Sequence, residues 1–341
     1  MSVSIVIPCH NEEKTIQSTF NFIVKQTLKP SQVFFVNDLS SDNTFKELLK
    51  LKRNNKTEIK IKIFNTTKNL FRAGACNLAL KHVNTDYVVI MDAGSLLEKH
   101  AVEYAIDYLS KEEKNGLVCS RAGLIKSSGL LYRLQKLEYA NTDLSRMISQ
   151  NNVLISHGLF TAAKTKYLRE VNFYSEGVLL EDYDLTVKMK LKGYKASFDP
   201  NIKAYTNSVD KIGSFQKQRF RWFLGGLDVL KKFGWNKATR IDYFGHILYF
   251  IFFFTVMGTL VFGANQFFSY GQFNNIMLLP ISLSVINYVT SLLSLKFVEG
   301  CTKKDVLLKI IIFPELFYCV FQELIRWKAY LTFIFINDRR W

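Results

Sequence analysis

One segment restricts the possible folds of this chain more than any other: residues 243–295 contain no Asp, Glu, Lys or Arg. A helix needs roughly 20 apolar residues to cross the hydrocarbon core of a bilayer. Residues 243–268 and 276–295 each reach that length, and a polar break at 269–275 separates them. We therefore expect two transmembrane helices joined as a hairpin.

Basic residues flank this hairpin on both sides but are absent from its tip. Since Lys and Arg gather on the cytoplasmic side of membrane spans, both ends of the hairpin are expected in the cytoplasm. The chain opens on a strand-like pattern with no apolar signal sequence ahead of it, which favours the same location for its first part. The basic residues are Lys231, Lys232, Lys237 and Arg240 before the hairpin, and Lys296, Lys303 and Lys304 after it.

The final stretch, residues 306–336, is apolar but is interrupted by charged residues. This pattern predicts either a third crossing or helices that lie in the membrane interface, and we expect at least one part to be interfacial. Residues 236–341 are thus interpreted as a membrane segment, residues 1–235 as a cytoplasmic domain, and the chain as a multi-pass protein of the cell membrane. The interrupting residues are Lys309, Glu315, Glu323, Arg326 and Lys328.

The first 235 residues alternate short β-branched runs with amphipathic helical patterns. This alternation predicts an α/β fold with a mainly parallel sheet, which binds ligands at the carboxyl ends of its strands. Nothing before residue 240 resembles a linker or a repeat, so we expect one domain. The predicted strands are 3–8, 33–36, 59–64, 87–91 and 153–162, and the predicted helices begin near residues 16, 44, 73, 130 and 183.

The formal net charge of +16 raises the question of nucleic-acid binding. Such binding modules interleave basic residues with stacking aromatic side chains, and no such pattern is present in the sequence. The excess charge instead gathers beside the apolar segments, where it faces anionic lipid headgroups. The five cysteines are widely spaced and form no C-x-x-C pair, which fits a reducing compartment. A lipid bilayer, and no nucleic acid, is the expected partner.

Polar residues follow the first two predicted strands. Pro8 and Glu12 lie in the sequence VIPCHNEE, and Asp38 lies in FVNDLSSDNT. Together these segments resemble family 2 glycosyltransferases, whose nucleotide-sugar domain opens with a P-x-x-N-E motif and continues with D-x-S-x-D-x-T. The resemblance implies a GT-A-like fold in which Pro8, Glu12 and Asp38 bind the nucleotide of a UDP-sugar. Taken singly, Asp38 is more typical of a turn or a helix cap than of a binding site, and it is the presence of both motifs that favours binding.

Two further segments resemble donor-binding motifs of the same family. Arg72, in KNLFRAGACN, precedes a helix whose N-terminus favours anions, so it is a candidate for binding the diphosphate; the alternative is a solvated surface arginine. Asp92, in IMDAGS, lies where the family carries its D-x-D metal motif, which implies Mg²⁺ or Mn²⁺ as a cofactor. Gly94 replaces the second carboxylate, so Asp92 is the only metal ligand that this motif retains.

The remaining motifs concern the acceptor. Glu181 and Asp182 resemble the family's E-D motif, which implies that Asp182 is the catalytic base that deprotonates the acceptor hydroxyl; an acidic pair can also simply compensate a helix dipole. Gln218, Arg221 and Trp222 form the Q-x-x-R-W pattern of cellulose, chitin and hyaluronan synthases. Trp222 offers a platform for a sugar ring. In the alternative reading, Trp222 lies in an aromatic belt while Arg219 and Arg221 contact lipid headgroups.

These motifs favour an inverting membrane glycosyltransferase that extends a β-linked polysaccharide from a UDP-sugar. One alternative is a single-transfer enzyme acting on ceramide, diacylglycerol or polyprenyl phosphate, because two spans offer little wall for a polymer channel unless chains associate as a homo-oligomer. Another is a non-catalytic membrane scaffold that has lost its metal motif, for which Gly94 is the one direct indication. The sequence does not distinguish between the possible donor sugars.

Overall fold

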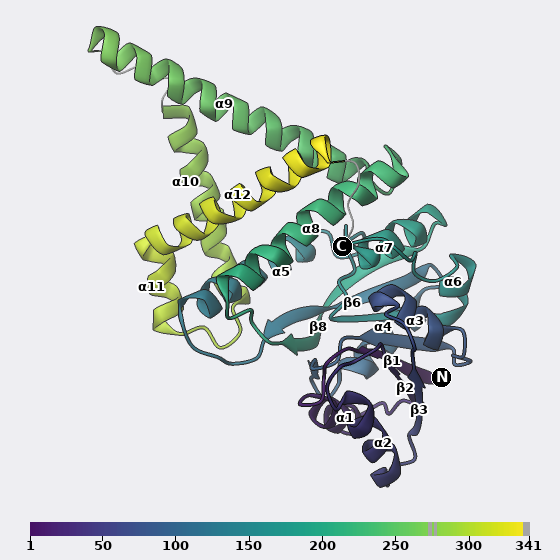
Figure 1. The fold of residues 1–341 in the computed structure, drawn as a ribbon. Coiled ribbons are helices and arrows are strands. Elements are labelled where there is room, and N and C mark those ends of the chain that lie inside the picture. The colour runs from purple at the N-terminus through teal and green to yellow at the C-terminus, as the bar shows by residue number, and fades with distance from the viewer. Residues whose placement is uncertain (272–274, 276–277, 337–341) are drawn as a thin grey trace.

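The computed structural model describes residues 1–271, 275 and 278–336, which form an α/β body and a helical C-terminal part (Figure 1). The body is built on one eight-stranded sheet with the order β3-β2-β1-β4-β7-β6-β8-β5. Strands β3, β2, β1 and β4 run parallel, and β7 pairs antiparallel with both β4 and β6. The predicted α/β fold with a mainly parallel sheet is therefore confirmed. The strands are β1 (Val3–Cys9), β2 (Gln32–Asn37), β3 (Lys60–Asn65), β4 (Tyr87–Met91), β5 (Leu96–Leu97), β6 (Asn115–Leu124), β7 (Phe160–Lys164) and β8 (Lys195–Thr206).

Helices cover both faces of this sheet, because successive side chains of a buried strand point in opposite directions. In β1, Ile5 and Ile7 pack with Phe20 of α1 on one face, whereas Val6 packs with Leu80 of α3 on the other. Both faces of the parallel strands are thus apolar, as a sheet covered on two sides requires. The helices of the body are α1 (Ile16–Val24), α2 (Thr44–Asn54), α3 (Phe71–Leu80), α4 (Ala101–Lys111), α5 (Leu130–Ile148), α6 (Thr165–Glu170) and α7 (Glu181–Leu191).

The predicted strand at residues 153–162 is wrong over most of its length. Only Phe160–Lys164 forms a strand, β7, and the preceding residues form an irregular connection. Apolar residues at 153, 155 and 159 imitate a strand pattern, but they surround the tripeptide Ser156-His157-Gly158. The Val153 N–H still bonds to the Ala196 carbonyl of β8. Farther along, the Ser156 N–H bonds to the Thr186 hydroxyl and the Gly158 N–H to the Asp182 carboxylate, so side chains hold this part of the backbone.

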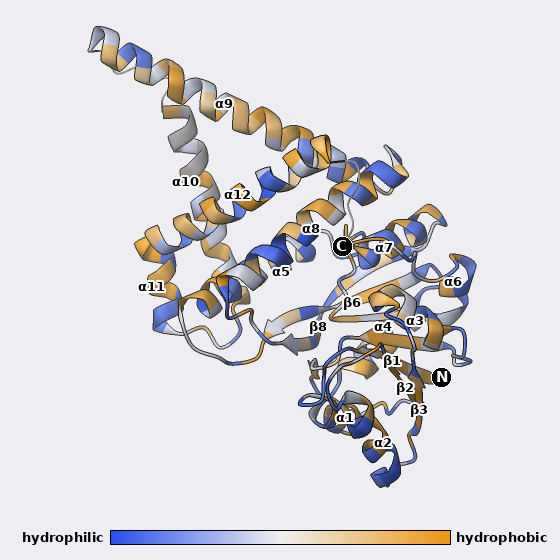
Figure 2. Ribbon diagram, in the orientation of Figure 1, coloured by the Kyte–Doolittle hydropathy of each residue, from blue (hydrophilic) through white to orange (hydrophobic). Residues whose placement is uncertain are grey.

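The C-terminal part begins with α8 (Ile212–Phe233) and continues into α9 (Arg240–Tyr270), which extends away from the body in Figure 1. Within the residues that the structure describes, α9 is the one helix long and apolar enough to cross a membrane. Its 31 residues span about 46 Å at 1.5 Å per residue. Figure 2 shows apolar residues along most of its length, in agreement with the first predicted span.

The second predicted span, 276–295, lies partly outside the described residues. Its described portion forms α10 (Leu278–Leu293), followed by the short 3₁₀ helix η2 (Ser294–Phe297). Residues 306–336 form two helices, α11 (Lys303–Ile311) and α12 (Phe313–Phe335). Tyr318 and Ile325 of α12 pack against Phe215 of α8, while large apolar residues elsewhere on α12 remain exposed. The number of spans and the division at residue 235 stay predictions.

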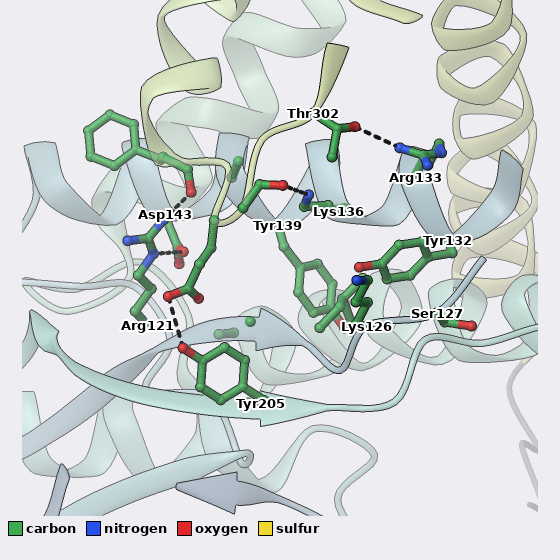
Figure 3. Close-up of a pocket in the computed structure, with 17 residues that line it drawn as sticks. Arg121, Lys126, Ser127, Tyr132, Arg133, Lys136, Tyr139, Asp143, Tyr205 and Thr302 are labelled. Carbon is green, nitrogen blue, oxygen red and sulfur yellow. Dashed lines mark hydrogen bonds and ion pairs between the residues drawn. The ribbon is translucent and has the colours of Figure 1, made fainter. Parts of the chain in front are cut away.

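An ionic junction fastens the C-terminal helices to the body. Asp305, at the start of α11, is fully buried and accepts hydrogen bonds from Arg133 at 2.6 Å and Lys136 at 3.0 Å, both on α5. Its carboxylate also accepts the backbone N–H and hydroxyl of Thr302, which completes a capping box. The junction borders a cavity of about 300 Å³ whose walls include Arg121, Tyr139 and Tyr205 (Figure 3).

Candidate active site

Arg72 joins three elements that are far apart in the sequence. Its Nε donates to Asp92 at 2.7 Å, Nη1 donates to Glu181 at 3.0 Å, and Nη2 donates to the carbonyl of Gly158 at 2.7 Å. Asp92 follows β4, Glu181 opens α7, and Gly158 lies in the connection before β7. The Arg72 side chain is only 21% exposed, so the reading of it as a solvated surface arginine is wrong.

Gly158 is required for this arrangement. A Cβ atom at position 158 would lie 2.7 Å from Nη2 of Arg72 and 2.8 Å from its Cζ. The guanidinium group therefore packs directly against backbone that has no side chain. Sequence patterns did not single out Gly158, because the reason for a glycine here is contact with a residue 86 positions away.

Asp182 lies next to this cluster and is oriented by backbone groups. Its Oδ2 accepts the N–H of Gly158 at 3.0 Å, and its Oδ1 accepts the N–H of Tyr183 at 2.8 Å. Burial, together with the nearby Glu181 carboxylate, raises the pKa of Asp182 to about 6, although Arg72 opposes the shift. A fixed carboxylate with a raised pKa is well suited to accept a proton near neutral pH.

Asp92 remains open to a ligand, since its side chain is 45% exposed. Two residues later, Gly94 adopts φ +79°, and a Cβ there would lie 3.4 Å from Thr15 and 3.7 Å from the Glu12 carboxylate. A second aspartate at position 94 would be strained and would face Glu12. Burial and the charge of Asp92 also raise the pKa of Glu12, whose carboxylate accepts the Thr15 hydroxyl.

The residues do not form a metal site by themselves. Within the described residues, no group of three or more His, Cys, Asp or Glu side chains is arranged to hold a metal ion. Asp92 supplies one carboxylate, which Arg72 already contacts. A single carboxylate fits a cation such as Mg²⁺ only when phosphate and water provide the other ligands, which is how Mg²⁺ commonly binds.

Asp38 follows β2 and supports the loop that leads to Arg72. Its Oδ1 accepts the N–H of Leu70 at 2.8 Å and the Thr66 hydroxyl at 3.1 Å. The side chain is almost fully buried, and its own carbonyl oxygen is 2.7 Å from the His10 ring. Pro8 lies beside Val36 in the β1–β2 register, so the ends of the first two strands are adjacent, as predicted.

The Q-x-x-R-W residues of α8 occupy different surroundings. Trp222 is half-buried and packs with Leu180 and Tyr183, the residues that flank the Glu181–Asp182 pair. Arg221 is exposed, and among the described residues no hydrogen bond or ion pair joins it to the Arg72 cluster. Gln218 accepts a hydrogen bond from Arg219. The structure thus brings Trp222, but neither Arg221 nor Gln218, next to Asp182.

Arg219 is a structural residue that the sequence patterns misplaced. It is 1% exposed, forms a two-pronged ion pair with Glu138 of α5 at 2.6 and 2.9 Å, and stacks on Trp222 at 4.2 Å. The reading that placed Arg219 on lipid headgroups is therefore wrong. Its neighbour Arg221 has the same chemistry and lies at the surface, and only the packing of α8 against α5 and α12 distinguishes the two.

A cavity of about 310 Å³ is lined by Leu180 and Tyr183, the residues on either side of the Glu181–Asp182 pair, but not by Asp182 itself. Leu180, Tyr183 and Trp222 form one end, and residues of α9 and α12 form the other. The Tyr183 hydroxyl donates to Asp242 of α9 at 2.6 Å, which ties α7 to the start of α9. The cavity in Figure 3 is separate, and none of the predicted site residues lines it.

Comparison with known proteins identifies the relatives of this chain. The family model described as Glycosyl transferase family 2 matches residues 4–171. The poly-β-1,6-N-acetyl-D-glucosamine synthase of Staphylococcus aureus (strain COL) is 28% identical over 234 residues, or 67% of this chain, and that of Staphylococcus epidermidis is 27% identical over 239 residues, or 69%. The matches cover 55% and 57% of those synthases, so the chain spans about half the length of the curated relatives it matches.

A solved structure resembles nearly the whole chain. The mannosyltransferase PcManGT from Pyrobaculum calidifontis, in complex with GDP-Man and Mn²⁺, superposes with a TM-score of 0.64 over 98% of this chain and 88% of that chain. The two sequences are 17% identical, so the likeness concerns the fold. It extends beyond the α/β body and includes the C-terminal helices.

Proposed function

Because the chain carries a glycosyl transferase family 2 domain, we propose that it extends a β-linked polysaccharide at a membrane, using a UDP-sugar as donor and inverting the anomeric centre. The general activity, glycosyl transfer, follows from the family. The polysaccharide acceptor, the uridine nucleotide and the membrane location are the proposed parts. The relatives that synthesise poly-β-1,6-N-acetyl-D-glucosamine support the acceptor, and their name makes UDP-N-acetylglucosamine the first donor to test.

The observation that carries the proposal is that Asp182 bonds to Gly158, which Arg72 also contacts, while its neighbours Leu180 and Tyr183 pack with Trp222. Two backbone N–H groups fix its carboxylate, and its raised pKa fits a base. In the proposed step, an acceptor hydroxyl attacks the anomeric carbon while the bond from that carbon to the diphosphate oxygen breaks. Asp182 takes the hydroxyl proton, and the nucleoside diphosphate leaves with the bonding electrons.

We assign the donor to the carboxyl ends of β1, β2 and β4. Pro8, Glu12 and Asp38 would bind the nucleotide, and Arg72 would lie beside the diphosphate. Arg72 alone cannot neutralise the diphosphate, because its single positive charge already faces the Asp92 and Glu181 carboxylates. We therefore propose that Mg²⁺ or Mn²⁺ enters with the diphosphate and that Asp92 is its protein ligand.

We place Trp222, with Glu181 beside it, on the acceptor side. Gln218 and Arg221 are assigned to the same side by the Q-x-x-R-W pattern. Because Arg221 is exposed and Gln218 bonds to Arg219, we propose that they belong to the outer part of the acceptor site.

A membrane location is supported by α9 and by the exposed apolar residues of α12. We propose that residues 1–235 form the cytoplasmic domain and residues 236–341 the membrane segment of a multi-pass protein. In this arrangement α9 crosses the bilayer, and α12 lies in the interface with its packed face on α8. A polymer channel would require further helices, which a homo-oligomer would supply.

Two other functions remain to be tested against this one. A single-transfer enzyme with a lipid acceptor would use the same donor site and the same membrane segment. A non-catalytic scaffold is disfavoured because the charged groups expected of an active site are held together: Arg72 bonds to Asp92 directly and to Asp182 through Gly158. The solved structure that binds GDP-Man makes GDP-mannose the control donor.

The test is nucleoside diphosphate release by the purified protein in phospholipid vesicles, with UDP-N-acetylglucosamine, UDP-glucose and GDP-mannose supplied separately. We expect release of UDP and none of GDP, and its loss in Asp182→Asn, which keeps the shape of the side chain. Product sizing then separates a polymer from a singly glycosylated lipid. Release of GDP alone would reject the uridine donor, and full activity of Asp182→Asn would reject the assignment of the base.

A further inference from the structure

The peptide group that joins His157 to Gly158 is held on both of its sides. Its N–H belongs to Gly158 and donates to Oδ2 of Asp182 at 3.0 Å. Its carbonyl belongs to His157 and accepts the hydroxyl of Thr161 at 2.9 Å. Because a peptide group is planar, the direction of the carbonyl determines the direction of the N–H. The contact between Thr161 and the carbonyl therefore also sets the direction of the bond to Asp182.

Thr161 is a suitable anchor because it belongs to a regular strand and is buried. It lies in β7, directly after the irregular connection, and is only 3% exposed. Its hydroxyl oxygen is also 3.0 Å from the hydroxyl of Ser156. A hydroxyl donates one hydrogen and can accept others. Thr161 can thus donate to the His157 carbonyl and accept from Ser156, which fixes its own hydrogen on the peptide group.

The ring of His157 anchors the same residue to β6. Its Nε2 is 2.7 Å from the carbonyl oxygen of Ser120. β7 pairs with β6 only as far as Cys119 and Thr161, and residues 200–202 of β8 have no counterpart in β6 after Ser120. Ser120 therefore lies where the ladder is interrupted on both sides, as at a β-bulge, and the His157 ring supplies a donor there.

This ring is a neutral N–H donor. Burial and the charge of Arg146 lower the pKa of His157 to about 3, although the bond to Ser120 opposes the shift. A neutral imidazole carries its hydrogen on one nitrogen, and the carbonyl acceptor places that hydrogen on Nε2. A group with so low a pKa is a poor general base near neutral pH. The task that fits His157 is to hold the backbone.

The N–H of Gly158 also affects the ionisation of Asp182. Burial and the Glu181 carboxylate raise the pKa of Asp182, whereas Arg72 and the N–H groups of Tyr183 and Gly158 lower it. A hydrogen bond to the charged form of a carboxylate favours that form. If the Gly158 bond were lost while Glu181 and Arg72 stayed in place, Asp182 would ionise only at higher pH.

We propose that Thr161 and His157 are positioning residues for the catalytic base, and that together they orient the peptide group 157–158 so that its N–H holds Asp182. The proposal rests on the role of Asp182 proposed above and adds to the site two residues that lie outside its motifs. Their effect depends on contacts with β6 and β7, which bring Ser120 and the irregular connection together.

The acidic limb of the pH profile of kcat tests this role. Thr161→Val keeps nearly the same shape but lacks the hydroxyl, so the peptide group loses its anchor. We expect the limb to move to higher pH by roughly half a unit. Thr161→Ser keeps the hydroxyl and should keep the limb at its wild-type position. The profiles are measured as UDP release from UDP-N-acetylglucosamine by the full chain in phospholipid vesicles.

A second pair of variants keeps the test decisive if Thr161→Val does not fold. His157→Leu removes the donor to Ser120, whereas His157→Gln keeps a side-chain N–H. We expect the limb to move to higher pH in His157→Leu and to return toward its wild-type position in His157→Gln. Equal limbs in these two variants would contradict the role of the ring.

Thr85→Val is the matched control for the loss of a buried threonine hydroxyl. Thr85 precedes the amino end of β4, and its hydroxyl is 2.8 Å from the Ser4 hydroxyl and from the Tyr87 carbonyl. This variant should lose similar thermal stability but keep the wild-type limb. A wild-type limb in Thr161→Val, or an equal shift in Thr161→Ser or Thr85→Val, would overturn the positioning role. Turnover that persists in Asp182→Asn would instead overturn the proposed function.

Discussion

The guanidinium group of Arg72 lies against Gly158 so closely that a Cβ at position 158 would be 2.7 Å from Nη2. Gly158 also donates its N–H to Asp182, so one glycine contacts both the candidate diphosphate cation and the candidate base. Replacement of Gly158 by alanine would push the arginine away from Asp92 and Glu181.

We expect Gly158→Ala to lower kcat about tenfold, because displacing reacting groups by about 1 Å is enough for losses of up to 100-fold. Thermal stability should change little, since the clashing atoms belong to the end of a long side chain. Gly213→Ala, at an exposed position of α8, is the control for the loss of a glycine and should retain full activity. An active Gly158→Ala enzyme would show that the contact with Arg72 is unimportant.

Arg72→Lys tests whether geometry matters at this position in addition to charge. Lysine keeps the positive charge but cannot contact Asp92, Glu181 and the Gly158 carbonyl at once. We expect kcat/KM for the donor to fall about 10- to 100-fold, and Arg72→Met to be lower still. Steady-state kinetics with varied donor concentration measures both effects. Equal activity of the lysine variant and the wild type would contradict the three-contact role.

The pH dependence of kcat reports on Asp182. Burial raises its pKa to about 6, whereas an unperturbed aspartate titrates near 3.9. Because the base must be ionised, activity should fall as the pH drops through about 6. Arg72→Met removes a cation that favours the ionised form of Asp182, so in this variant the acidic limb of the pH profile should lie at higher pH. A limb near pH 4 in the wild type would exclude a buried base at this position.

Arg219 and Arg221 should differ sharply in their effect on folding. Removing one partner of a buried ion pair costs about 3–5 kcal/mol, so Arg219→Ala should strongly lower the free energy of unfolding. Arg221→Ala, at an exposed position, should change it by at most about 0.5 kcal/mol. Denaturant unfolding in a mild detergent measures both. Similar losses in the two variants would mean that the Glu138 pair contributes little.

Donor affinity should depend on a divalent cation through Asp92. Calorimetric titration with the UDP-sugar should show tighter binding with Mn²⁺ than with a chelator, and Asp92→Asn should reduce that difference at least tenfold. This titration measures the binding affinity for the donor, so it does not depend on catalytic turnover. Equal affinity with and without the cation would contradict a metal-dependent donor site at Asp92.

The parallel half of the sheet was predictable because local patterns define it. Runs such as 33–36 and 87–91 are short, β-branched and flanked by turn residues, and the structure has strands at both. The contribution of Gly158 was not predictable, because it depends on where Arg72 lies in space. Nor could the sequence predict that Arg219 is buried and Arg221 exposed, because this difference depends on how α8 packs against α5 and α12.

The predicted strand at 153–162 shows a second limit of sequence patterns. Val153 and Leu159 lie in the two core clusters, whereas Leu154 and Ile155 between them are only partly buried, and the backbone of this segment bonds to side chains of α7. A short run rich in apolar residues therefore does not by itself indicate a strand. It is this irregular connection that brings Gly158 to Asp182 and Arg72.

In the proposed function, Arg72, Asp182 and Trp222 belong to one active site that transfers sugars to a glycan chain at a membrane. The most direct measurement is the size distribution of the radiolabelled product made from UDP-N-acetylglucosamine by the purified protein in vesicles. We predict a polymer that lengthens with time, is absent in Asp182→Asn and is degraded by a β-glucosaminidase of matching specificity. A product that stops at one sugar on a lipid, or a polymer that persists in Asp182→Asn, would contradict the account.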